Sequence, residues 1–210
     1  MSYDAEATRR RIFEAAAAEF AARGLAGARI ERIATEARAN KQAIYLYFGG
    51  KEKLFGAVVR AAMEEIGKTT EIDPARLTES VGRLFDWYQE HPELIRLLLW
   101  EALETPGEVQ GEDERRAAFR RKADRFAAAG GPAEPGGGPA EPDGGSREVQ
   151  DLMFTVFGLI AWSFAVPQLR RLILDEDDEA AALARRRAAV LEAARVLAEA
   201  HRSGPAGAAR

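Results

Sequence analysis

Residues 30–51 constrain the fold more than any other stretch, because they predict two short helices joined by a tight turn. Apolar residues recur on one face of a first helix over 30–37, namely Ile30, Ile33, Ala34 and Ala37. Asn40 is a good N-cap for a second helix over 41–48. Gly49 and Gly50 then end that second helix.

The second helix of this pair separates inward from outward side chains. Ile44 and Phe48 are four residues apart, so both can point inward. Four residues remain for the outside: Lys41, Gln42, Tyr45 and Leu46. A short helix that carries such groups outward suits the major groove of DNA.

The charge of the chain is divided in a way that agrees with this interpretation. The net charge is -4. Residues 1–55 contain 10 Lys and Arg and 7 Asp and Glu, a net charge of +3. The rest of the chain contains 20 Lys and Arg and 27 Asp and Glu, a net charge of -7. A basic head on an acidic body is expected when only one end of a protein meets phosphate.

The rest of the chain predicts further helices, so the fold class is all-α. A first helix over 4–23 carries the apolar stripe Ile12, Phe13, Ala16, Phe20 and Ala21. Its arginines, Arg9 to Arg11, form either a solvated face or a set from which one or two reach DNA phosphates. Phe13, Phe20, Ile33, Ile44 and Phe48 are expected to form the core of a three-helix head. Later helices are expected over 51–68, from 77, over 94–103, 112–129 and 146–166, and after 175, with Pro167 bending or ending the 146–166 helix.

Two later segments set the organisation of the body. Residues 130–145 contain GGPAEP twice and predict a flexible loop, either disordered or a mobile gate. Residues 152–166 lack charge, but this run is shorter than the roughly 20 residues of a membrane span, so no membrane association is expected. Burial against the body on one side and a partner subunit on the other explains such a helix. The tail over 203–210 is expected to fray.

Residues 8–55 resemble the N-terminal domain of the TetR family of bacterial transcriptional repressors. The resemblance rests on the order and spacing of Ile12, Ala15, Phe20, Gly24, Gly27, Ile33, Ala34, Ala37, Lys41, Tyr45, Tyr47, Phe48, Lys51 and Glu52. It implies a helix-turn-helix head at 1–55 and a helical body at 56–203 that dimerises and binds a small-molecule effector. It further implies that the helix over 146–166 and the last helix, after residue 175, form a four-helix interface between two copies.

The expected partner of the head is double-stranded DNA with a pseudo-palindromic operator. A twofold homodimer presents its recognition helices about one helical turn apart, roughly 34–36 Å, or a multiple of it. Base contacts are expected from Lys41, Gln42, Ala43, Tyr45 and Leu46, and phosphate contacts from Arg29, Tyr47 and Lys51. Three positions depart from the family pattern: Arg38 in the turn, Ala28-Arg29 before residue 30, and Gly50. If Arg38 adopts a left-handed backbone, the cost is roughly 1–2 kcal/mol.

The body contains more aromatic side chains than packing obviously needs. An effector pocket is predicted from Trp87, Tyr88, Trp100, Glu101, Phe119, Phe126, Phe154, Phe157 and Trp162. The alternative for each aromatic residue is a place in the core, and Glu101 either orients a ligand or points to solvent.

An enzyme is not expected from this sequence. It has no cysteine and only two histidines, and it lacks the spacing of a metal site or a phosphate-binding glycine loop. No catalytic residue, metal or cofactor is therefore predicted. Without cysteine or an N-terminal secretion signal, the expected location is the cytoplasm. The alternative function is a helical DNA-binding protein or adaptor that responds to no ligand.

Overall fold

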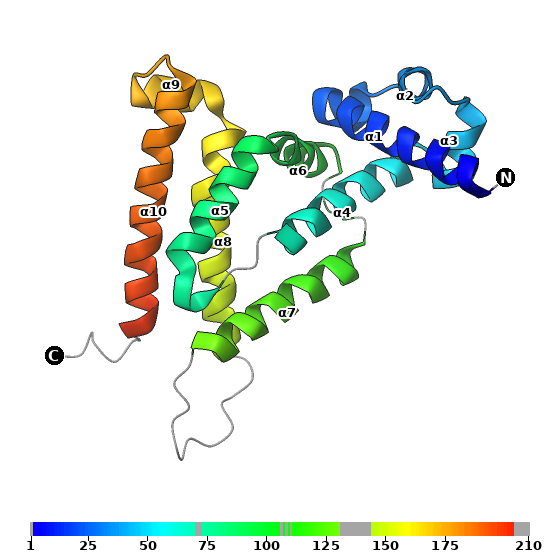
Figure 1. The fold of residues 1–210 in the computed structure, drawn as a ribbon. Helices are drawn as coiled ribbons and strands as arrows, with labels where there is room; N and C mark the ends of the chain where they lie inside the picture. The colour runs from blue at the N-terminus through cyan, green and yellow to red at the C-terminus, as the bar shows by residue number, and fades with distance from the viewer. Residues whose placement is uncertain are drawn as a thin grey trace. The chain divides into compact units, whose positions relative to one another are not determined.

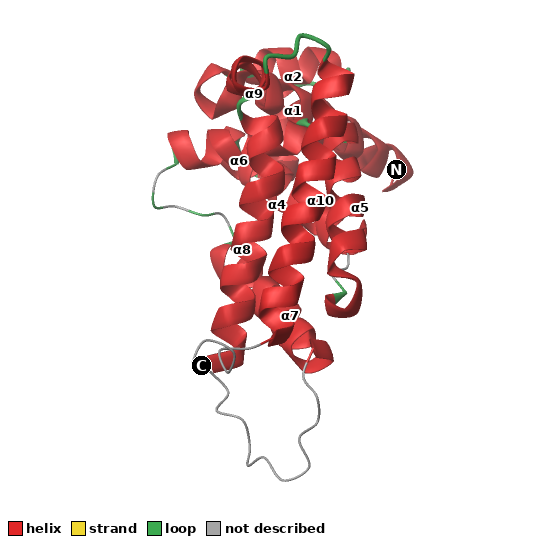
Figure 2. Ribbon diagram, turned by 90° about the vertical axis from the view of Figure 1, so that its left-hand side faces the viewer, coloured by secondary structure: helices red, strands yellow, loops and turns green. Residues whose placement is uncertain are grey.

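The computed structural model describes residues 2–69, 73–105, 107, 109, 111–130 and 144–203, and its regular structure within those ranges is entirely helical (Figures 1 and 2). The chain divides into two compact units. Unit 1 comprises Met1–Thr69 and His91–Asp113, and unit 2 comprises Thr70–Glu90 and Glu114–Arg210. The expected functional boundary near residue 55 stays a prediction.

Unit 1 is organised around α1 (Ser2–Gly27), which packs against every other helix of the unit. These partners are α2 (Ile30–Glu36), α3 (Lys41–Phe48), α4 (Lys51–Thr69) and α6 (Glu93–Glu104). Phe20 and Phe55 meet edge to face at a centroid distance of 5.1 Å in the core. Of the predicted head core, Phe20, Ile33 and Ile44 are fully buried, while Phe13 and Phe48 are half-buried against them.

Unit 2 is built on three helices that pack side by side. They are α5 (Leu77–Glu90), α8 (Gly144–Ala165) and α10 (Glu179–Ser203). The short helix η1 (Pro74–Arg76) leads into α5, and α7 (Glu112–Gly130) and α9 (Pro167–Leu174) complete the described elements. Arg187 of α10 donates two hydrogen bonds to the carboxylate of Asp86 on α5, at 2.6 and 2.8 Å, which fixes how these two helices pair.

The structure tests two of the predicted helix boundaries. The expected bend or end at Pro167 is confirmed, because α8 ends at Ala165 and Pro167 begins α9. Proline lacks only an N–H that the first turn of a helix leaves unpaired, so it is well suited to this first position. The axis turns by 89° between α8 and α9. Helix α8 also begins at Gly144, two residues before the expected cap Ser146. The repeats within 131–143 and the tail over 204–210 lie outside the described residues.

No single helix in the described ranges is long and apolar enough to cross a membrane. The bent pair 147–165 and 167–174 meets the requirement of length and composition only when both helices are taken together.

Candidate nucleic-acid interface

The two ends of α3 are fixed by the residues that the sequence singles out. Asn40 has an extended backbone, and its side-chain Oδ1 accepts a hydrogen bond from the amide of Ala43 at 2.8 Å. Gly49 has a left-handed backbone with φ of 78°, and its amide bonds the carbonyl of Tyr45 at 2.9 Å. An eight-residue helix that is capped at both ends has a defined position and orientation for its side chains.

The turn between α2 and α3 depends on an unusual backbone at Arg38. This residue has φ of 50°, the left-handed conformation that glycine adopts most easily. Two hydrogen bonds stabilise the turn. The amide of Ala39 donates to the carbonyl of Ala34 at 2.9 Å, and Nε of Arg11 donates to the carbonyl of Ala37 at 3.0 Å. Arg11 therefore supports the turn from α1.

The outward face of α3 carries large side chains that packing does not bury. Ile44 is fully buried, whereas Tyr45 and Leu46 are 58% and 79% exposed and Gln42 is exposed beside them. Ala43 and Tyr47 are half-buried at the edges of this face. Exposed leucine and tyrosine next to an amide side chain are the groups that bind a thymine methyl and base edges.

The charged residues near this face are partly engaged within the protein. Lys41 pairs with Glu31 of α2 at 2.6 Å, and the hydrogen bond from Lys41 lowers the pKa of Glu31. Lys51 donates to the carbonyl of Ala28 at 3.3 Å. Arg29 is exposed, and its amide bonds Glu19 at 3.1 Å. The eight residues predicted to meet DNA therefore lie on α3 and on the residues that flank α2 and begin α4.

The nine predicted pocket residues are divided between the two units. Trp100 and Glu101 lie on α6 in unit 1, and both have partners or packing there. Phe154 and Trp162 of α8 are 81% and 60% exposed, because the buried side of α8 is formed by other residues, among them Val156 and Ile160.

The remaining five pocket residues are aromatic and lie in unit 2. Phe119 of α7 meets Phe157 of α8 edge to face at 6.3 Å, and Tyr88 of α5 meets Trp87 at 5.6 Å. Burial raises the pKa of Tyr88. Phe126 is buried and approaches His201 at 6.0 Å. Phe164, seven residues after Phe157 on α8, contacts Tyr88. The ring pairs Phe119–Phe157 and Tyr88–Phe164 therefore lie on the same face of α8.

Trp100 takes part in a contact that the sequence does not reveal. Its indole N–H donates to the carbonyl of Ala21 at 3.4 Å, and Glu104 accepts hydrogen bonds from the amides of Leu25 and Ala26, the second at 3.0 Å. Gly24 lies between them with φ of 68°, and a Cβ there would stand 2.7–2.8 Å from Glu104 and Trp100. The partners are 78 or 79 residues apart in sequence, so no local pattern indicates the contact.

Both parts of the chain match described protein families. Residues 12–58 match the family described as bacterial regulatory proteins, tetR family, and residues 77–195 match the tetracyclin repressor-like C-terminal domain. HTH-type transcriptional repressor SCO4008 of Streptomyces coelicolor is 42% identical over 176 residues, 83% of this chain and 88% of that protein. HTH-type transcriptional repressor NicS of Pseudomonas putida is 39% identical over 106 residues, 47% of this chain and 50% of that protein.

A solved structure resembles most of this chain. It is that of SCO4942 from Streptomyces coelicolor, described as a transcriptional regulator, with a TM-score of 0.70 and 29% identity. The match covers 90% of this chain and 97% of that one.

Proposed function

The chain belongs to the TetR family of bacterial regulatory proteins, and we propose that it is a ligand-responsive repressor that binds a pseudo-palindromic operator as a homodimer. The family consists of DNA-binding transcriptional regulators, not enzymes. The observation that carries the proposal is the outward face of α3, where Gln42, Tyr45 and Leu46 are exposed on a helix capped at both ends.

The roles on DNA follow from the chemistry of each side chain. Gln42 reads an adenine edge through its amide, and Leu46 contacts a thymine methyl. Lys41, Ala43 and Tyr45 complete the base-reading surface. Arg29, Tyr47 and Lys51 contact phosphates, which position the protein without reading sequence.

The homodimer is proposed to form through α8 and α10. These helices pack side by side, and Phe154 and Trp162 of α8 and Val196 of α10 are large apolar side chains that remain exposed. Covering them with a second copy removes apolar surface from water. Twofold symmetry then presents two copies of α3 to the two halves of one operator.

The effector is proposed to be a small apolar or aromatic molecule that binds beside the aromatic pairs of unit 2. Phe119, Phe157 and Tyr88 provide ring surfaces from three helices. A ligand that prefers the form unable to bind DNA shifts the population toward it. To change the ratio of the form unable to bind DNA to the DNA-binding form from 1:99 to 99:1, the ligand must bind the former more tightly by about 5.5 kcal/mol.

One experiment tests the DNA-binding function. Duplexes that the protein binds are selected from a random pool, and the selected sequence is titrated with wild type, Gln42→Ala and the control Gln89→Ala, an exposed position on α5. We expect a palindrome, and we expect Gln42→Ala to weaken binding by about 1–3 kcal/mol while it relaxes base preference at one position of each half-site. Equal losses on the selected duplex and on random DNA would remove Gln42 from base reading, and failure to enrich a palindrome would contradict the proposal.

The effector is tested with the same duplex. Compounds are screened for release of the DNA, and an active compound is titrated again with Phe157→Ala. Weaker release from this variant, with unchanged DNA affinity in the absence of compound, supports the aromatic site. Identical release curves would place the effector elsewhere.

A further inference from the structure

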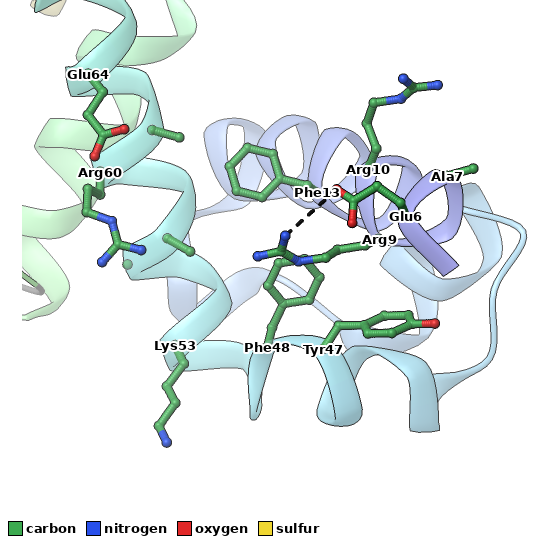
Figure 3. A pocket seen from close by; sticks show the side chains of 13 residues that line it. Glu6, Ala7, Arg9, Arg10, Phe13, Tyr47, Phe48, Lys53, Arg60 and Glu64 are labelled. Carbon is green, nitrogen blue, oxygen red and sulfur yellow. Dashed lines mark ion pairs between the residues drawn. The ribbon is translucent and has the colours of Figure 1, made fainter. Parts of the chain in front are cut away.

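A groove in unit 1 lies beside the outward face of α3 and shares only Tyr47 with it. It has a volume of about 750 Å³ and is formed by α1, the end of α3 and residues 53–64 of α4 (Figure 3). This volume falls within the range of roughly 300–1,000 Å³ that small-molecule sites occupy. Gln42, Tyr45 and Leu46 do not line it.

Aromatic rings form one part of the groove. Phe13 of α1 and Phe48 of α3 lie with ring centroids 6.3 Å apart, and Tyr47 adjoins them. All three side chains are half-buried, so they provide apolar surface that is still accessible. Ala57 and Ala61 line the α4 side, where their small size leaves space above the rings. A planar aromatic group has matching surfaces here.

Positive charge is in excess around these rings. The groove is lined by Arg9, Arg10, Lys53 and Arg60, and by two acids, Glu6 and Glu64. Figure 3 shows Arg9 and Arg60 pointing into the groove from the α1 side and the α4 side.

The two facing arginines are weakly engaged. Arg9 pairs with Glu6 only at 3.9 Å, and both side chains are largely exposed. The guanidinium of Arg9 lies 5.6 Å from the centroid of Phe48, which holds the charge over the ring. Arg60 has no ion pair or hydrogen bond with the described residues. Both guanidinium groups are therefore available to an anion, for which a planar fork of donors is well suited.

We propose that this groove is a binding site for a small aromatic anion, a planar ring system that carries one carboxylate, sulfonate or phosphate. The ring lies against Phe13 and Phe48, and the anionic group accepts hydrogen bonds from Arg9 and Arg60. The site is separate from the aromatic pairs of unit 2, and it does not depend on the proposed repressor function.

Two probes that differ only by a sulfonate group test this site on the full chain. The anionic probe is 1-anilinonaphthalene-8-sulfonate, and N-phenyl-1-naphthylamine has the same ring system without the sulfonate. Both are titrated by fluorescence into wild type, Arg60→Gln and Arg9→Gln. The control is Arg23→Gln, which removes the same charge from α1 outside the groove. Thermal unfolding confirms that each variant is folded.

We expect Arg60→Gln and Arg9→Gln each to weaken binding of the sulfonate about tenfold, because each removes a charge-assisted hydrogen bond. Binding of the neutral probe should change little in these variants, and Arg23→Gln should bind both probes as wild type does. A further variant, Ala57→Leu, fills the groove without a change of charge and should weaken both probes. Sulfonate affinities that are the same in Arg60→Gln and Arg23→Gln would overturn the proposal, as would unchanged binding of both probes to Ala57→Leu.

Discussion

Arg38 is the residue at which the helix-turn-helix carries backbone strain. Its left-handed conformation costs a non-glycine residue roughly 1–2 kcal/mol, whereas a glycine loses about 0.5–1 kcal/mol through the greater freedom of its unfolded chain. We therefore expect Arg38→Gly to raise the free energy of unfolding by about 0.5–1 kcal/mol, measured by urea denaturation.

The matched control for this variant is Glu36→Gly, an exposed residue in the last turn of α2. Glycine at a regular helical position lowers stability by up to about 1 kcal/mol, so the two substitutions should have opposite signs. A loss of stability in both would mean that the Arg38 side chain contributes more to the turn than its backbone conformation costs.

Lys41 is paired with Glu31 in the free protein, and this pairing affects the proposed contact of Lys41 with DNA. The pair is exposed, so it contributes little to stability, but Glu31 also places a negative charge beside the proposed path of the DNA phosphates. We expect Glu31→Gln to raise affinity for the selected duplex by up to about fivefold. Because Lys41 lowers the pKa of Glu31, this difference persists at neutral pH and shrinks only as acid protonates Glu31.

Affinity is measured by titration of labelled duplex at fixed salt. Glu36→Gln removes the same charge from α2 without releasing Lys41 and serves as the control. An equal gain in the two variants would show that only the local charge matters and that Lys41 is free to reach DNA in either case.

Among the elements, α6 fixes the end of α1 through contacts that no sequence pattern indicates. Glu104 of α6 accepts hydrogen bonds from two amides that follow Gly24, where α1 departs from helical geometry. The chain then leads directly through Arg29 into α2. The contact therefore determines where the helix-turn-helix begins relative to α6.

We expect Glu104→Ala to lower the free energy of unfolding by about 1.5–3 kcal/mol. The substitution removes a charged acceptor, so the amides of Leu25 and Ala26 lose their hydrogen bonds to it. The measurement is chemical denaturation. Arg96→Ala, at an exposed position on the same helix, should change stability by less than about 0.5 kcal/mol. Comparable effects of the two substitutions would contradict a specific role for Glu104.

The success of sequence reasoning differs between elements for a physical reason. The caps of α3 at Asn40 and Gly49 are local interactions, so the sequence predicts both ends of that helix correctly. The bend or end expected at Pro167 is also a local effect and is confirmed, whereas the 89° angle between α8 and α9 depends on packing. Trp100 contacts Ala21 and Gly24 of α1, which are far away in sequence. Because the sequence does not reveal these contacts, the prediction of a pocket role for Trp100 rests only on its aromatic side chain.

At the scale of the whole molecule, the proposed recognition of a palindromic operator requires two copies of the chain to pair. One α3 reads only one half-site, and affinity for a palindrome arises when both halves are bound at once. The exposed apolar residues of α8 and α10 are the proposed contact between copies. Phe154 is the most exposed of them, at 81%.

We expect Phe154→Glu to convert the dimer to a monomer, because the interface would have to bury an unpaired carboxylate. Sedimentation equilibrium measures the association directly. Gln89→Glu adds the same charge at an exposed position of α5 and should remain dimeric.

DNA binding by Phe154→Glu distinguishes loss of the dimer from damage to the DNA-binding head. A dimeric protein binds the full palindrome far more tightly than a duplex with one half-site, whereas a monomer that keeps an intact α3 binds both duplexes with the same weak affinity. We therefore expect Phe154→Glu to lose the preference for the full site and to retain half-site binding. If the variant stays dimeric and keeps that preference, the contact between copies must use other exposed apolar residues of unit 2, for which Leu172 and Ile173 of α9 are the candidates.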